Sequence, residues 1–232
     1  MVCLKPLNSQ HFSNSQYLVI FSKRFETLFT FGKYKHGLVE KDLHQFSDEE
    51  LILEFQQNGN EEAFEILIER FKNPLMNFVY RFLGDYESCT DVVQETFIKV
   101  FRYKDSYSSL AKFNTWIYTI AGNLARSEYR RRKRRNFFSI NDYGEDHQTF
   151  DIPDNNYRPD DVTDSGIKDE IIQKALLKVK EVYRVAVILR DIQELSYEEI
   201  SEILGIEVGT VKSRINRGRA QLQKLLKHIY KD

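Results

Sequence analysis

The stretch LSYEEISEILGIEVGTVKSRINRGRAQLQKLL, residues 195–226, decides the fold of the C-terminal part of the chain. Ser196 and Glu199 have the spacing of a capping box, so the sequence predicts that a short helix begins there. Gly205 follows at the place where a left-handed residue often ends a helix. A longer helix is expected to begin near Glu207. A short helix, a tight glycine turn and a second helix together predict a helix-turn-helix.

The second helix of this motif separates an apolar face from a polar face. With about 100° between successive residues, one face carries apolar or small side chains: Val211, Ile215, Gly218 and Leu222. The opposite face carries donors and small polar groups that can enter a major groove: Lys212, Ser213, Asn216 and Arg217. The flanks place three side chains where phosphates would lie: Thr210, Arg214 and Arg219. A solvated charged face is the alternative interpretation. Because the capping box, the turn glycine and the basic face coincide, the motif favours DNA binding.

Helical periodicity also indicates an N-terminal domain. Ser47 and Glu50 form another capping box, which predicts the start of a helix. The next helix is predicted to be kinked or locally broken at Asn73-Pro74, because proline removes a backbone donor. Two further helices are expected over about residues 88–103 and 110–135. Four helices with short connections make a compact all-helical domain.

Charge is segregated along the chain. The net charge of −1 hides a basic run at residues 130–135 (RRRKRR) and an acidic stretch at residues 142–164. When charges are segregated in this way, a near-zero net charge does not exclude nucleic-acid binding. The acidic stretch also contains proline and glycine and has no periodicity, so it predicts a flexible linker. The expected organisation is all-α, with a poorly ordered extension (1–44), a helical domain (45–136), the acidic linker (137–168) and a second small helical domain (169–232).

The sequence carries no pattern expected of an enzyme or a metalloprotein. Cys3 and Cys89 have neither metal-ligand spacing nor the spacing of a disulfide framework, which predicts a reducing, cytoplasmic setting. The five histidines are scattered, and none has a convincing partner. The apolar run at residues 17–21 is too short to span a membrane, and no signal-peptide cleavage site follows it. We expect no catalytic residue, no metal, no cofactor and no direct membrane insertion.

The amino-acid sequence of the C-terminal motif resembles that of a known family. Residues 189–191 (LRD), 195–200 (LSYEEI) and 209–214 (GTVKSR) closely resemble region 4 of extracytoplasmic-function (ECF) sigma factors. These subunits direct bacterial RNA polymerase to promoters. The resemblance implies that the helix-turn-helix reads the promoter −35 element. Where relatives commonly have Leu-Pro, this chain has Val179-Lys180, which predicts a continuous helix there.

Residues 91–97 (DVVQETF) resemble region 2.2 of the sigma-70 family, which docks on the clamp helices of the polymerase β′ subunit. One face of the predicted helix carries acidic and amide groups with an apolar edge: Asp91, Gln94, Glu95 and Ile98. Such a face is complementary in charge to a basic coiled coil. From composition alone, a solvated face is the alternative.

Residues 113–123 (FNTWIYTIAGN) resemble regions 2.3 and 2.4, which melt and read the −10 element. Melting needs a basic surface for the backbone and a pocket for an unstacked base. The resemblance implies that Asn123 and Tyr107 help to form the pocket, whereas Trp116 is predicted mainly as core. Ser127 stands where many relatives carry Asp. The side chains expected to contact −10 DNA are Tyr107, Lys112, Asn114, Asn123, Arg126, Arg130 and Arg131.

Both motifs occur in the family's order, so the sequence predicts an ECF sigma factor that acts in a stress or envelope response. The resemblance implies three partners: core RNA polymerase, through its β′ clamp helices and β flap; promoter DNA; and an anti-sigma factor. A stand-alone helix-turn-helix regulator is the alternative, but it would need a dimerisation element, and none is visible. The acidic linker could thread the polymerase toward its active site or act as a plain tether, and the sequence leaves both open.

Overall fold

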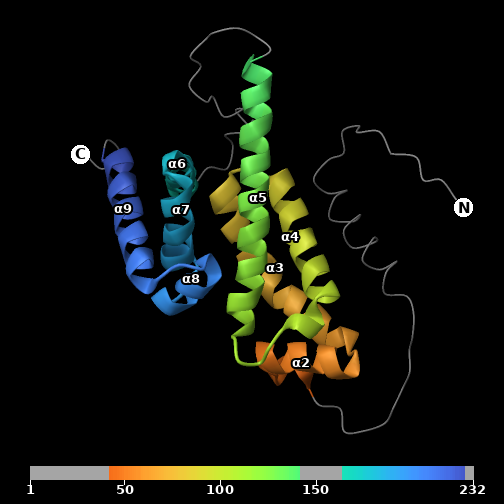
Figure 1. Ribbon diagram of the computed structural model, residues 1–232. Coiled ribbons are helices and arrows are strands. Elements are labelled where there is room, and N and C mark those ends of the chain that lie inside the picture. The colour runs from red at the N-terminus through yellow and green to blue at the C-terminus, as the bar shows by residue number, and fades with distance from the viewer. Residues whose placement is uncertain (1–41, 142–163, 228–232) are drawn as a thin grey trace, which may run out of the picture. The chain divides into compact units, whose positions relative to one another are not determined.

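The computed structural model describes residues 42–141 and 164–227, and Figure 1 shows how their helices are arranged. Within these two ranges the chain forms helices joined by turns, with no β-strand, so the all-α prediction is confirmed. Nearly all of the predicted N-terminal extension and most of the predicted acidic linker lie outside the described residues.

Four α-helices build the N-terminal domain. Its elements are the 3-10 turn η1 (Leu43–Gln45), α2 (Asp48–Asn58), α3 (Glu61–Leu83), α4 (Tyr86–Arg102), the 3-10 turn η2 (Lys104–Ser106) and α5 (Phe113–Asn141). α2 begins at the predicted capping box. The backbone N–H of Ser47 donates to the Glu50 carboxylate at 2.8 Å, and the N–H of Glu50 donates to Ser47 Oγ at 3.3 Å. α5 continues beyond the expected domain boundary at residue 136.

Aromatic side chains dominate the core of this domain. Six phenylalanines are fully buried: Phe55, Phe64, Phe78, Phe82, Phe97 and Phe113. Burying each of them stabilises the fold by about 1.5–3 kcal/mol. α5 contributes Ile117 and Ala121 to this core, so the other side of α5 is left to face outward.

Pro74 lies inside α3, and the helix is not interrupted there, so the predicted local break is absent. Pro74 itself is exposed, whereas Phe71 and Leu75 beside it are buried. A proline in a helix interior removes one backbone hydrogen bond. Burial of the neighbouring side chains outweighs that loss and keeps α3 continuous.

The C-terminal domain contains the predicted helix-turn-helix. Its elements are α6 (Asp164–Lys178), α7 (Glu181–Val187), a π-helical turn η4 (Ile188–Ile192), α8 (Tyr197–Leu204) and α9 (Val208–Leu226). Gly205 ends α8 in the left-handed conformation, with φ 63°. α9 passes close to α7 at Gly218, where a Cβ atom would lie 2.4 Å from Cγ2 of Val187. Glycine is therefore what allows the two helices to approach this closely.

α6 and α7 are separate helices, so the predicted continuous helix at Val179-Lys180 is wrong. Lys180 has extended backbone angles, φ −56° and ψ 133°. The guanidinium of Arg184 donates to the carbonyl oxygens of Leu177 at 2.8 Å and Val179 at 3.0 Å. Carbonyls at a helix end have no partner within the helix. Arg184 supplies that partner and so stabilises the break.

The C-terminal domain contacts the end of α3. Arg184 also donates to the carbonyl oxygen of Phe82 at 2.7 Å. The side chain of Gln173 donates to the carbonyl oxygen of Tyr80 at 3.0 Å. Gly84, with φ 81°, ends α3 so close to Leu177 that a Cβ atom there would lie 2.5 Å from Leu177 Cδ1. Polar bonds and close packing thus both contribute to this contact.

A second contact joins α5 to the helix-turn-helix, and α8 lies beside α5 (Figure 1). The hydroxyl of Tyr118 donates to Gln193 Oε1 at 2.6 Å, and Lys112 Nζ lies 2.9 Å from Glu199 Oε1. Gln193 Nε2 is buried without a hydrogen-bond partner in the described part of the chain. An unpaired buried donor costs about 1–3 kcal/mol. The unpaired donor of Gln193 therefore lowers the stability that this contact contributes.

Candidate nucleic-acid interface

α9 presents its predicted polar face to solvent. The exposed side chains are those expected to enter a major groove: Lys212, Ser213, Asn216 and Arg217. Val211 and Ile215 on the opposite face are buried, as is Gly218. The helix can therefore be approached by a duplex along one side while the other side stays packed in its domain.

Two of these donors interact with tyrosine side chains. Lys212 Nζ lies 5.5 Å from the ring centroid of Tyr197. Arg217 Nη1 is 3.5 Å from the hydroxyl oxygen of Tyr183, and this arginine lowers the pKa of the Tyr183 hydroxyl. Such contacts are long and leave both cations exposed, so each cation remains available to DNA.

The flanks of α9 differ from one another. Arg219 Nε donates to Asp191 Oδ2 at 3.0 Å, and this hydrogen bond raises the pKa of the guanidinium. Arg219 is thus engaged in holding α9 against η4. Thr210 is exposed, and its carbonyl oxygen accepts a bond from the Ser213 hydroxyl at 2.9 Å. Arg214 is half-buried, and its positive charge contributes to lowering the pKa of the Arg126 guanidinium.

On α5, Asn123 and Arg126 form one polar group. Asn123 is exposed, and its Oδ1 accepts a hydrogen bond from Arg126 Nη2 at 2.7 Å. Burial lowers the pKa of the Arg126 guanidinium, and the positive charges of Arg130 and Arg214 lower it further. Positive charge from both domains therefore gathers beside this part of α5, where it favours a nucleic-acid backbone.

Some arginines of the basic run at residues 130–135 form ion pairs and others do not. Glu128 takes up three cations, lying 2.6 Å from Arg131, 3.1 Å from Arg132 and 3.6 Å from Arg135. Arg132 also pairs with Asp85. Arg130 is exposed and forms no ion pair with any described residue. Arg130 is thus better placed for phosphate than Arg131.

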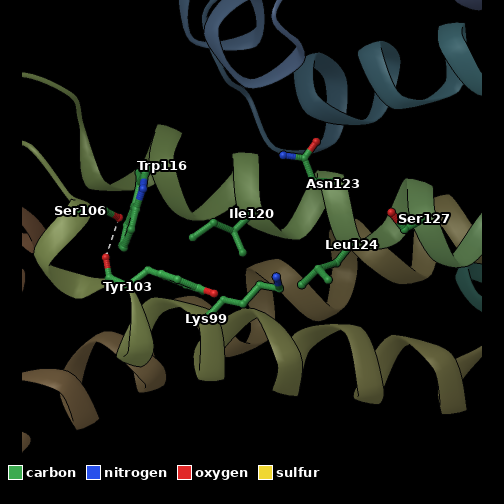
Figure 2. Close-up of a pocket in the computed structure, with 8 residues that line it drawn as sticks. All are labelled: Lys99, Tyr103, Ser106, Trp116, Ile120, Asn123, Leu124 and Ser127. Carbon is green, nitrogen blue, oxygen red and sulfur yellow. Dashed lines mark hydrogen bonds between the residues drawn. The ribbon is translucent and has the colours of Figure 1, made fainter.

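A hollow of about 360 Å³ lies between α4 and α5, and Figure 2 shows its lining. The lining residues are Lys99, Tyr103, Ser106, Trp116, Ile120, Asn123, Leu124 and Ser127. Of these, only Asn123 belongs to the set expected from the sequence. Its side chain points away from Tyr103 and Lys99 (Figure 2), so it borders the hollow rather than filling it. Nothing in the local pattern signalled Tyr103, which ends α4 in an otherwise amphipathic helix.

The structure does not bring Tyr107 into this hollow. Tyr107 is 5% exposed, and its hydroxyl donates to the carbonyl oxygen of Ala111 at 2.6 Å. Its ring packs against Phe113 and Trp116, with centroids 5.9 and 5.3 Å away. Trp116, predicted mainly as core, lines the hollow instead. Tyr107 therefore packs against Trp116 without lining the hollow itself.

The two remaining residues expected at −10 DNA lie near the start of α5. Lys112 is exposed but paired with Glu199 of α8 at 2.9 Å, and this hydrogen bond raises the pKa of the ammonium group. Asn114 is half-buried in the first turn of the helix.

The outward face of α4 matches the set expected to meet the polymerase. Asp91 is exposed, Gln94 and Glu95 are half-buried, and Ile98 is 38% exposed. Their spacing of three and four residues places them on one side of the helix. Neither carboxylate forms an ion pair within the described ranges, so both charges are available to a basic partner.

Across residues 42–141 and 164–227, no three His, Cys, Asp or Glu side chains are grouped so that they could hold a metal ion. None of the helices described is both long and apolar enough to cross a membrane.

Two family models match the chain: Sigma-70 region 2 over residues 67–135 and Sigma-70, region 4 over residues 169–222. The ECF RNA polymerase sigma factor SigW of Bacillus subtilis is 35% identical over 175 residues, which are 75% of this chain and 94% of the relative. The ECF RNA polymerase sigma-E factor of Haemophilus influenzae is 31% identical and covers 80% of this chain and 98% of its own length. The chain belongs to the sigma-70 family, as an ECF sigma factor.

Solved structures agree with this assignment. The sigma factor RpoE of Bartonella quintana, solved with the anti-sigma factor NepR, has a TM-score of 0.55 at 25% identity and covers 72% of this chain and 98% of its own. CnrH, solved with the cytosolic domain of CnrY, has a TM-score of 0.58 at 23% identity, covers 78% of this chain and 97% of its own, and shows the same fold. The sigma factor therefore directs RNA polymerase to promoters for transcription initiation.

Proposed function

We propose that three surfaces of this sigma factor bind the −35 element, the −10 element and the polymerase. α9 reads the −35 duplex, the surface of α4 and α5 holds single-stranded −10 DNA, and the outward face of α4 docks on the polymerase. The observation that carries the proposal is the exposure of Lys212, Ser213, Asn216 and Arg217 on one face of a helix whose other face is buried.

At −35, Asn216 and Arg217 are the side chains proposed to read bases. In a major groove arginine favours guanine and asparagine favours adenine. Thr210, Lys212, Ser213 and Arg214 then position the helix on phosphates or base edges. Arg219 is assigned to the contact with Asp191 rather than to DNA.

At −10, the backbone is proposed to follow the exposed side of α5. Arg126 and Arg130 supply positive charge there, with Asn123 beside them. The hollow between α4 and α5 accepts an unstacked base, because it combines aromatic and apolar walls with a cation. Lys112 can join this surface once its bond to Glu199 is released.

The partners follow from the same surfaces. Asp91, Gln94, Glu95 and Ile98 are proposed to meet the basic β′ clamp helices, and the C-terminal domain is proposed to meet the β flap. The complex of Bartonella quintana RpoE with NepR supports an anti-sigma factor as a further partner here. We infer that the chain acts in the cytoplasm and by binding, without catalysing a reaction itself.

The test is assembly with bacterial core RNA polymerase, followed by transcription from the region upstream of its own gene. Asp91→Arg or Glu95→Arg is expected to abolish the complex, because charge complementarity is reversed. Glu65→Arg is the matched control, since Glu65 is an exposed acid on α3, outside the docking face. Lys212→Ala with Arg217→Ala should leave the complex intact and abolish transcription. Binding to DNA as a free dimer without core binding would instead indicate a stand-alone regulator.

A further inference from the structure

One side of α9 runs along α7, and the two helices lie side by side (Figure 1). Arg214, Arg217 and Gln221 follow one another on this side at a spacing of three and four residues. Gly218 permits the close approach, because a Cβ atom there would lie 3.1 Å from the carbonyl oxygen of Tyr183 and 3.4 Å from the Cβ of Tyr183. Tyr183 is therefore packed against α9 directly beside Arg217.

Two polar contacts join this side of α9 to α7. The backbone N–H of Lys180, which caps the start of α7, donates to Gln221 Oε1 at 3.2 Å. Arg217 Nη1 lies 3.5 Å from the hydroxyl oxygen of Tyr183. The two contacts are one turn apart on both helices, so the bond at Gln221 fixes the register in which Arg217 meets Tyr183.

The hydroxyl of Tyr183 lies among cations. Arg217 lowers the pKa of this hydroxyl, and the charges of Lys180 and Arg214 lower it further. Lys180 Nζ also lies 6.0 Å from the centroid of the Tyr183 ring. Like charges repel one another, so Lys180 and Arg214 alone would drive the Arg217 guanidinium away from α7. The hydroxyl oxygen of Tyr183 is an acceptor that opposes this repulsion.

The contact with Tyr183 leaves most donors of Arg217 free. A guanidinium has five N–H donors, and Tyr183 meets only the nitrogen Nη1. The edge formed by Nε and Nη2 can still donate to O6 and N7 of a guanine in a major groove. Arg217 is exposed, so this edge can face DNA while Nη1 stays on Tyr183.

We propose that Tyr183 is a positioning residue for base recognition at −35: its hydroxyl holds the Arg217 guanidinium so that Nε and Nη2 meet a guanine. This inference rests on the proposed reading of a −35 base by Arg217. A side chain that is already ordered loses less conformational freedom on binding and presents its donors to one base edge. Tyr183 thus affects the choice of base without touching DNA itself.

The experiment measures base preference at each position of the −35 element. The full-length chain in complex with bacterial core RNA polymerase binds duplexes that carry the region upstream of its own gene, randomised across that element, and the bound fraction is sequenced. Arg217→Ala identifies the base pair that Arg217 reads, where the preference should fall by roughly 5- to 150-fold, the value of one bidentate pair. Tyr183→Phe should lower the preference at the same base pair by roughly 2- to 13-fold, the cost of ordering one flexible side chain.

Three comparisons separate positioning from a structural role. In Tyr183→Phe the preference at other base pairs should be unchanged, including the one read by Asn216, whereas a displaced α9 would weaken all of them. In an Arg217→Ala background, Tyr183→Phe should cause no further loss. Tyr86→Phe is the matched control, since Tyr86 is 59% exposed on α4 in the other domain, and it should leave every preference unchanged.

The proposed function and this inference fail in different ways. If the wild-type complex selects no −35 sequence, or if Arg217→Ala changes the preference at no base pair, the proposed reading by Arg217 is wrong and the inference is wrong with it. If Arg217→Ala removes the preference at one base pair and Tyr183→Phe keeps it in full, Arg217 reads DNA without help from Tyr183. Loss of preference at every position in Tyr183→Phe would also overturn the inference, because it would indicate a structural role.

Discussion

The guanidinium of Arg184 donates a hydrogen bond to the carbonyl oxygen of Phe82 across 2.7 Å, and so links the C-terminal domain to the last turn of α3. Arg184 is 4% exposed and lies over the rings of Phe82 and Tyr129, 5.6 and 5.5 Å from their centroids. Burial lowers the pKa of this guanidinium, and the neighbouring Tyr129 opposes that shift. One side chain thus satisfies carbonyl groups of both domains.

Replacing Arg184 with methionine is expected to lower the free energy of unfolding by about 2–3 kcal/mol, because the buried carbonyl groups of Phe82, Leu177 and Val179 lose their shared donor. Urea denaturation followed by circular dichroism measures this. Lys224→Met, at an exposed position of α9, is the control and should change stability by less than about 0.5 kcal/mol. Equal stability of the two variants would show that the Arg184 bonds contribute nothing net.

Gly218→Ala is expected to destabilise the C-terminal domain by about 1–3 kcal/mol, because the new methyl group would overpack the crossing of α7 and α9. Its Cβ would meet Val187 Cγ2 at 2.4 Å and the carbonyl oxygen of Tyr183 at 3.1 Å. Gly209, in the first turn of the same helix, has nothing within 4 Å of an added Cβ. Gly209→Ala should therefore be neutral or stabilising by up to about 1 kcal/mol. Thermal unfolding of the two alanine variants compares them directly, and similar melting temperatures would refute the packing argument.

Stability should fall in acid through two carboxylates. The Lys112 hydrogen bond, with the Ser196 N–H, holds the pKa of Glu199 below its usual range. Burial raises the pKa of Asp85, but hydrogen bonds and the charge of Arg132 outweigh it and keep that pKa lowered. A lowered folded-state pKa gives stability that is full above the unfolded value near 4 and is lost as pH falls through the folded value.

Glu199→Gln tests how much Glu199 contributes to the loss of stability in acid. Glutamine still fits the capping box but cannot pair with Lys112 as an anion. Between about pH 5 and pH 3, the melting temperature of the variant should fall by less than that of the wild type. Glu198→Gln, at the exposed neighbouring position, should keep the whole decline. Identical pH profiles for Glu199→Gln and the wild type would contradict the assignment.

The thiol of Cys89 should be unreactive in the folded chain. Burial, with the nearby Asp85 charge, raises its pKa to about 12, so little thiolate forms near neutral pH. In a Cys3→Ser background, iodoacetamide is expected to leave native protein unmodified and to label one thiol after unfolding in urea. Mass spectrometry counts the labels, and rapid labelling of the native protein would show that Cys89 is accessible.

Features set by neighbours in sequence were predictable, and features set by distant partners were not. Both capping boxes, the left-handed Gly205 and the two faces of α9 follow from local spacing, and the structure has all of them. The break at Val179-Lys180 was missed because it depends on Arg184 reaching back to carbonyl groups of α6 and across to α3.

The same distinction applies to the site. Arg131 and Arg219 look like phosphate ligands in sequence, but Glu128 and Asp191 occupy them. Tyr107 was expected at the pocket from the resemblance, whereas Tyr103 was not, and tertiary packing buries Tyr107 and leaves Tyr103 exposed. The residues expected to contact DNA stay predictions, and DNA binding by their alanine variants tests them.

Hydrogen bonds and ion pairs join the two domains, and Gln193 Nε2 has no partner in the part of the chain that the structure describes. Water can replace such partners when the domains part. A ligand that prefers the joined or the separated arrangement shifts the ratio of the two populations tenfold for each ~1.4 kcal/mol of preference. Energy transfer between dyes on the two domains, with and without core polymerase, would measure that ratio. A shift toward separated domains on polymerase binding would mean that the contact between the domains is released before promoter DNA is bound.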